Sequence, residues 1–184
     1  MALSDIPGVL GEPLTLDAGQ HVFRQGDRDR RLYLVEQGLL KAYYLADDGK
    51  ETIKSFITEG DFIGSLASAY RQETCSFNLV CQERSVLIPM DFDVLVSAGK
   101  ENLSVAARLM EVLLSLAMKK ERREMELLSL SAEDRYRRLL EHSPELIERV
   151  KQKDIARYLG ITPVALSRIR RRIEKQKRSE TNSV

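Results

Sequence analysis

The sequence predicts an α+β protein with an N-terminal antiparallel β-roll, a long dimerisation helix and a C-terminal helix-turn-helix domain. Three observations favour this fold class. Glycines separate short alternating runs from Glu12 to Pro89, residues 100–130 contain neither proline nor glycine, and arginines gather towards the end of the chain. The expected boundaries are 1–99 for a sensory, effector-type roll, 100–130 for the long helix and 131–184 for the last domain.

Composition narrows the class of protein before any motif is considered. The 184 residues carry a net charge of +1 and 43% hydrophobic residues, which suits a globular chain. No apolar run approaches the roughly 20 residues that span a bilayer, and the N-terminus lacks a secretion-signal pattern. A cytoplasmic protein without a membrane partner is therefore expected. No nucleophile–base pair, paired catalytic carboxylates or metal-ligand cluster stands out, so neither an enzyme, a metal centre nor a cofactor is predicted.

The roll is predicted from glycine spacing and strand alternation. Leu14 and Leu16 alternate with polar neighbours, and Asp48-Gly49 lies between two apolar runs, which is typical of a hairpin turn. Many short strands with tight turns favour a small antiparallel roll. The pattern leaves open whether that roll contains a pocket.

Cys75 and Cys81 are the only cysteines. Six residues of strand extend roughly 20 Å, so the two thiols lie too far apart to form a disulfide with each other. We interpret them as small buried hydrophobes. Redox pairing with a second subunit is the alternative.

A short helix and then the long helix are expected after the roll. Asp91 is placed near the N-cap of the short helix, and Gly99 just beyond its end. The long helix repeats apolar residues every seven positions, which is typical of a coiled-coil seam between two copies. The alternative is a helix packed on its own domain. The predicted dimer seam consists of Leu103, Ala106, Met110, Leu113 and Ala117.

The C-terminal domain carries local signals for each helix boundary. Ser131 followed by Asp134 approximates a capping box, and Pro144 is placed at the start of a further helix. In the segment 153–172, Gly160 is expected to end one helix, while Thr162 caps the next. Two short helices with such a turn form a helix-turn-helix, whose second helix enters the major groove of double-stranded DNA.

Charge favours nucleic acid as the partner of this segment. Residues 149–178 contain eleven Lys/Arg and two Asp/Glu, a net of +9, so the rest of the chain sums to −8. A nearly neutral protein with such a concentration fits a phosphate-binding surface. The inward face of the second helix is expected to comprise Val164, Ala165, Leu166 and Ile169.

The order of roll, seam helix and helix-turn-helix resembles the CRP/FNR family of bacterial transcription regulators. GDFIGSL at 60–66 is similar to the family's phosphate-binding cassette, and DIARYLGITPVALSRIRR at 154–171 to its DNA-reading motif. The resemblance is greatest to a short-ended branch of the family. It implies a cyclic-nucleotide-binding-like roll, a homodimer on two-fold DNA sites and contact with RNA polymerase.

Departures from the family pattern affect the effector. Cyclic-nucleotide-binding members have a glutamate and an arginine where this chain has Ser65 and Cys75, so both polar contacts to the nucleotide are missing. Cyclic AMP is therefore not expected, and the roll takes either another small molecule or no ligand. The cysteines of iron–sulfur members are also missing, since none precedes Cys75. The candidate effector pocket comprises Ile63, Gly64, Ser65, Leu66, Cys75 and Ser76.

The predicted recognition helix spans about 163–173. Arg168 matches the arginine that family members direct at a guanine. No strand pattern for a wing follows the helix, so affinity is expected to depend on phosphate contacts and to fall steeply with salt. The alternative function is a ligand-binding signalling module whose basic end contacts a protein or a membrane. The candidate DNA-binding residues are Thr162, Pro163, Val164, Ser167, Arg168, Arg170, Arg171 and Arg172.

Overall fold

A computed structural model describes the backbone of residues 9–181 and the side chains of residues 9–176. The chain forms two compact units that meet within one helix, with Arg122 ending the first and Arg123 beginning the second. The expected domain boundaries at 99/100 and 130/131 stay a prediction. Within the described residues, no helix combines the length and apolar character needed to cross a membrane.

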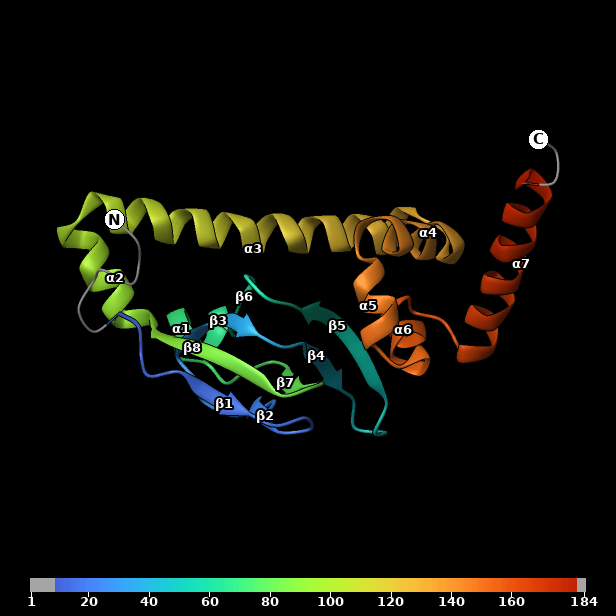
Figure 1. Cartoon of the computed structure of the whole chain (residues 1–184). Coiled ribbons are helices and arrows are strands. Elements are labelled where there is room, and N and C mark those ends of the chain that lie inside the picture. Colours follow the sequence, from blue (N-terminus) through green and yellow to red (C-terminus); the bar gives the residue numbers. More distant parts are fainter. Residues whose placement is uncertain (1–8, 182–184) are drawn as a thin grey trace. The chain divides into compact units, whose positions relative to one another are not determined.

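The first unit contains two four-stranded antiparallel sheets, in the orders β1-β8-β3-β6 and β2-β7-β4-β5 (Figure 1). The predicted antiparallel roll is confirmed. Its strands are β1 (Leu14–Leu16), β2 (His21–Phe23), β3 (Arg31–Gln37), β4 (Leu40–Leu45), β5 (Glu51–Ile57), β6 (Phe62–Ile63), β7 (Asn78–Cys81) and β8 (Ser85–Asp91).

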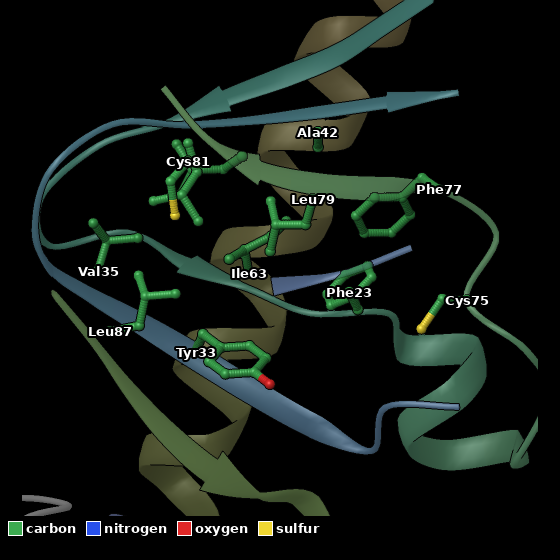
Figure 2. Close-up of a cluster of buried hydrophobic side chains, with 12 residues drawn as sticks. Phe23, Tyr33, Val35, Ala42, Ile63, Cys75, Phe77, Leu79, Cys81 and Leu87 are labelled. Carbon is green, nitrogen blue, oxygen red and sulfur yellow. The ribbon is translucent and has the colours of Figure 1, made fainter. Parts of the chain in front are cut away.

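Apolar side chains from both sheets form the core of the roll, as Figure 2 shows. Phe23 and Phe77 meet edge to face with ring centroids 5.2 Å apart, a favoured arrangement of aromatic rings. Cys75 and Cys81 are free buried thiols of the same cluster. Both cysteines therefore serve as small core residues, and burial raises the pKa of Cys81.

Two glycines show why the turns of the roll need this residue. Gly49 has φ +79° and its N–H donates to the Ala46 carbonyl at 2.9 Å, which confirms the hairpin between β4 and β5. Gly38 has φ +106°, and a Cβ there would lie 2.3 Å from Ser85 Oγ. A side chain at Gly38 is thus excluded both by conformation and by space.

Capping residues mark the starts of helices α1 (Leu66–Arg71), α2 (Phe92–Glu101) and α3 (Leu103–Ser129). Asp91 is the N-cap of α2, as predicted. The placement of Gly99 beyond the helix is wrong, because α2 continues to Glu101. Asn102 ends α2, and its side chain accepts from Ser104 N at 2.9 Å at the start of α3. Gly99 instead faces Ala106, whose Cα is 3.5 Å from a Cβ placed there.

The second unit holds the end of α3 with α4 (Ala132–His142), α5 (Pro144–Arg149), α6 (Gln152–Tyr158) and α7 (Pro163–Thr181). Ser131 Oγ accepts from Asp134 N at 3.1 Å, and Pro144 opens α5, as predicted. The recognition helix was expected to end near residue 173, but α7 continues to Thr181. Residues 174–178 are Glu, Lys, Gln, Lys and Arg, all strong helix formers.

Candidate functional site

The turn between α6 and α7 is held by backbone hydrogen bonds of a Schellman motif. Gly160 N donates to Arg157 O at 3.2 Å, and Ile161 N donates to Ala156 O at 3.0 Å. Gly160 has φ +71°, the left-handed conformation that this motif places after a helix. Thr162 Oγ1 then accepts from Ala165 N at 3.2 Å, and α7 begins at Pro163. The predicted end of the first helix at Gly160 and the predicted start of the second helix at Thr162 and Pro163 are confirmed.

One face of α7 is buried in the second unit. Leu166, Ile169 and Ile173 form this face, and their spacing of three and four residues places them in one row. On α6, Ile155 and Ala156 are buried as well, and the two helices are in contact. The apolar row therefore fixes the rotation of α7 about its own axis.

The opposite face of α7 is exposed and basic. The prediction that Val164 points inward is wrong, since its side chain is 62% exposed. Helical geometry explains this, because 100° per residue places position 164 opposite the row of 166, 169 and 173. Arg168, Arg171 and Lys175 continue the same row at intervals of four, three and four residues, and all are exposed. We call Val164, Arg168, Arg171 and Lys175 the outer stripe.

Lys175 was missed by the sequence analysis, although the helical period extended by one further turn would have found it. Other predicted contacts lie beside the outer stripe. Thr162 and Pro163 are exposed at the start of α7, while Ser167 is half-buried on its flank.

Two of the predicted arginines, Arg170 and Arg172, lie outside the outer stripe. Arg172 Nη1 lies 2.7 Å from Glu133 Oε2, and Arg137 Nη2 lies 2.9 Å from the other oxygen of that carboxylate. The hydrogen bond from Arg137 lowers the pKa of Glu133, and Arg172 adds to the effect. Arg170 is half-buried. The eight candidate residues therefore do not all belong to one surface.

Two further arginines hold the end of α6 behind the turn. Arg135 donates to the Leu130 carbonyl at 2.6 Å and to the Leu159 carbonyl at 2.9 Å. Arg123 lies over the Tyr158 ring, 3.7 Å from its centroid, and donates to the Tyr158 carbonyl. Cations suit the carbonyl end of a helix, so these arginines fix the orientation of α6. No local sequence signal identifies such long-range contacts.

The cassette residues in the first unit lie in different environments. Ile63 and Cys75 belong to the core cluster, and Ser65 is buried as the N-cap of α1. Leu66 and Ser76 are exposed. Gly64 lies against β3, because a Cβ there would lie 2.7 Å from the Arg31 carbonyl. The six candidate residues are thus near in sequence but do not share one surface.

A buried ionic network lies beside the cassette. Asp29 is 6% exposed, and its carboxylate accepts from Arg31 Nε at 2.9 Å, Arg31 Nη2 at 2.8 Å and the Tyr33 hydroxyl at 2.7 Å. Its backbone N–H donates to Ser68 Oγ on α1. Burial by itself would raise the pKa of Asp29, but the hydrogen bonds from Arg31 and Tyr33 outweigh it and lower the pKa.

Helix α3 carries an exposed apolar row in the first unit. Leu103 and Met110 are 86% and 61% exposed, and Leu114 and Met118 are exposed too. Ala106 and Leu113 of the predicted seam are half-buried and line an open groove of about 530 Å³ with Val96 and Gly99 of α2. Ala117 also lines the groove and is exposed.

Comparisons with known proteins match nearly the whole chain. The model of the cyclic nucleotide-binding domain matches residues 13–102. The regulatory protein HlyX of Actinobacillus pleuropneumoniae is 25% identical over 185 residues, covering 94% of this chain and 76% of that protein. The fumarate and nitrate reduction regulatory protein of Yersinia pestis is 26% identical over 187 residues, covering 94% and 73%. The structure of FixK2 from Bradyrhizobium japonicum shares the fold with a TM-score of 0.78 and 19% identity, covering 92% of this chain and 86% of that one.

Proposed function

We propose that the chain is a transcription regulator of the CRP/FNR type, a homodimer that binds specific double-stranded DNA. Each protomer would insert α7 into the major groove of one half-site. By family resemblance, the bound dimer contacts RNA polymerase.

The outer stripe of α7 is the observation that carries this proposal. It places Arg168 and Arg171 on an exposed face one helical turn apart, with Val164 at the N-terminal end that reaches base edges first. A guanidinium at Arg168 suits the O6 and N7 acceptors of guanine, and the methyl groups of Val164 suit a thymine methyl. Arg171 and Lys175 then lie further along the helix, where phosphates are the nearer targets.

Dimerisation follows from the exposed row on α3. A helix in water rarely leaves Leu103, Met110, Leu114 and Met118 uncovered, and the same row of a second copy covers them. Two copies of α7 related by a two-fold axis read two half-sites, so the DNA site is expected to be palindromic.

The effector is not cyclic AMP in this proposal. Ser65 and Cys75 replace the ribose and phosphate contacts of the nucleotide-binding members, and the Cys75 side chain packs in the roll core. Neither side chain can supply the charge that a cyclic phosphate requires.

Selection of binding sites from a random DNA library tests the proposal. The wild-type protein is expected to recover a two-fold symmetric motif. On that motif, log Kd should rise steeply with log salt, and Arg171→Ala should reduce the slope by about 2, since each of two lost phosphate contacts contributes about 0.9. Recovery of salt-sensitive binding without any motif would contradict the proposal and favour a signalling module with a basic contact surface.

A further inference from the structure

Arg172 lies beside the outer stripe of α7, but its charge is held by the domain itself. It follows Arg168 by four residues, which places the two side chains one helical turn apart and about 40° apart around the helix axis. Its side chain is 62% exposed, and its guanidinium lies 2.7 Å from the Glu133 carboxylate of α4. Arg172 therefore lies at the edge of the surface assigned to DNA while it is already paired with an anion.

Glu133 is fixed in place from α4. Its side chain is only 20% exposed, and Arg137, one turn further along the same helix, lies 2.9 Å from its other oxygen. Arg137 also donates to the Gln176 side chain of α7, so the two helices are bridged a second time. The hydrogen bond from Arg137 lowers the pKa of Glu133, and the carboxylate is therefore charged at neutral pH.

The Glu133 carboxylate offers Arg172 the same kind of partner as a DNA phosphate. A guanidinium pairs with carboxylates and with phosphates through the same forked, charge-assisted hydrogen bonds. Among the described side chains, Glu133 carries the one carboxylate within ion-pair distance of Arg172. An exposed ion pair of this kind is weak, so a phosphate competes with Glu133 for the guanidinium but has to displace it first.

We propose that Glu133 is an internal competitor of the DNA backbone and limits the affinity of α7 for DNA of any sequence. The proposal rests on the proposed function, in which α7 enters the major groove. While Glu133 holds Arg172, this arginine adds little to counterion release, whereas a freed Arg172 in each protomer would add one phosphate contact. Phosphate contacts carry no sequence information, and the base contact assigned to Arg168 uses no atom of the pair.

Binding of the full chain to a random-sequence duplex, measured by fluorescence anisotropy over a series of salt concentrations, tests the proposal. Glu133→Gln should bind at least about threefold more tightly than the wild type at low salt. Its plot of log Kd against log salt should be steeper by about 2, because each of two protomers gains a contact worth about 0.9. Glu141→Gln removes the same charge from the exposed last turn of α4 and, as the matched control, should keep the wild-type slope. Equal slopes in the two variants would overturn the proposal.

A double variant separates the release of Arg172 from other effects of Glu133. Arg172→Ala alone and Arg172→Ala combined with Glu133→Gln should bind random DNA equally, because neither retains a guanidinium that Glu133 could hold. A gain that persists in the double variant would overturn the proposal. So would loss of binding in Glu133→Gln, which would mean that Glu133 instead holds α7 in its binding orientation.

The proposed function and the role of Glu133 fail in different ways. Wild-type protein that recovers a two-fold symmetric motif, together with a Glu133→Gln variant that binds random DNA like the wild type, would overturn the competitor role alone. Wild-type protein that recovers no motif would contradict the proposed function, whatever the Glu133→Gln variant does.

Discussion

Replacing Asp29 by alanine should destabilise the roll by about 2–4 kcal/mol, a value worked from the contacts of its carboxylate. Tyr33 is fully buried, and its hydroxyl would lose its hydrogen-bond acceptor, which costs about 1–3 kcal/mol. The Arg31 side chain is about half exposed, so water takes over its hydrogen bonds and this pair adds only about 1 kcal/mol.

Hydrogen exchange of β3 amides in the full chain measures this loss of stability within the roll. It does not require the two units of the chain to unfold together in a single two-state transition. Asp48→Ala, on the exposed hairpin, is the control and should change exchange of β3 little. Tyr33→Phe removes the hydroxyl that Asp29 satisfies. The cost of Asp29→Ala should therefore fall by about 1 kcal/mol or more in the Tyr33→Phe background. An equal cost in both backgrounds would refute this reading of the network.

Three further predictions concern pH, backbone and assembly. Because the pKa of Asp29 is lowered on folding, its stabilisation is present above about pH 4, the unfolded value. The stabilisation is lost as the pH falls through the pKa that Asp29 has in the folded protein. The difference in hydrogen exchange between the wild type and Asp29→Asn should therefore narrow on acidification, and a constant difference would contradict the assignment. Gly38→Ala should cost clearly more stability than Gly49→Ala in thermal denaturation: both positions have positive φ, worth about 1–2 kcal/mol, but only Gly38 also clashes with Ser85. Met110→Glu should yield monomers in sedimentation velocity, whereas Glu111→Gln should leave the dimer intact, and a dimeric Met110→Glu would place the interface elsewhere.

Local chemistry in the sequence predicts much of this fold. Asp91, Ser131 and Thr162 cap helices through bonds to residues two or three positions away, so their roles can be read from short segments. The left-handed turn at Gly160 follows from the same local rules.

Errors arose where a feature depends on what lies beyond the segment. Gly99 looked like the residue just beyond the end of the helix, but α2 continues to Glu101 and Asn102, three residues after Gly99, is its cap. Because valine is apolar, the Val164 side chain was expected to point inward. The buried row through Leu166 and Ile169 instead sets the rotation of α7 and turns Val164 outward. Hydrophobic character alone does not determine which face of a helix is covered.

Long-range pairings explain what the sequence analysis missed in the candidate site. The pairing of Arg172 with Glu133 joins positions 39 residues apart, and the contact of Arg123 with Tyr158 joins positions 35 apart. Such features follow from the folded chain and from no single segment.

Binding of Arg168→Ala to the selected DNA motif and to its single-base variants tests the central claim most directly, with Arg172→Ala as the control. The account predicts that Arg168→Ala loses preference at one base pair in each half-site, by about 1–3 kcal/mol of discrimination. Arg172→Ala, whose guanidinium faces Glu133, should keep the preference at every position. Unchanged specificity in Arg168→Ala, or loss of the same preference in Arg172→Ala, would contradict the assignment of the outer stripe to the major groove.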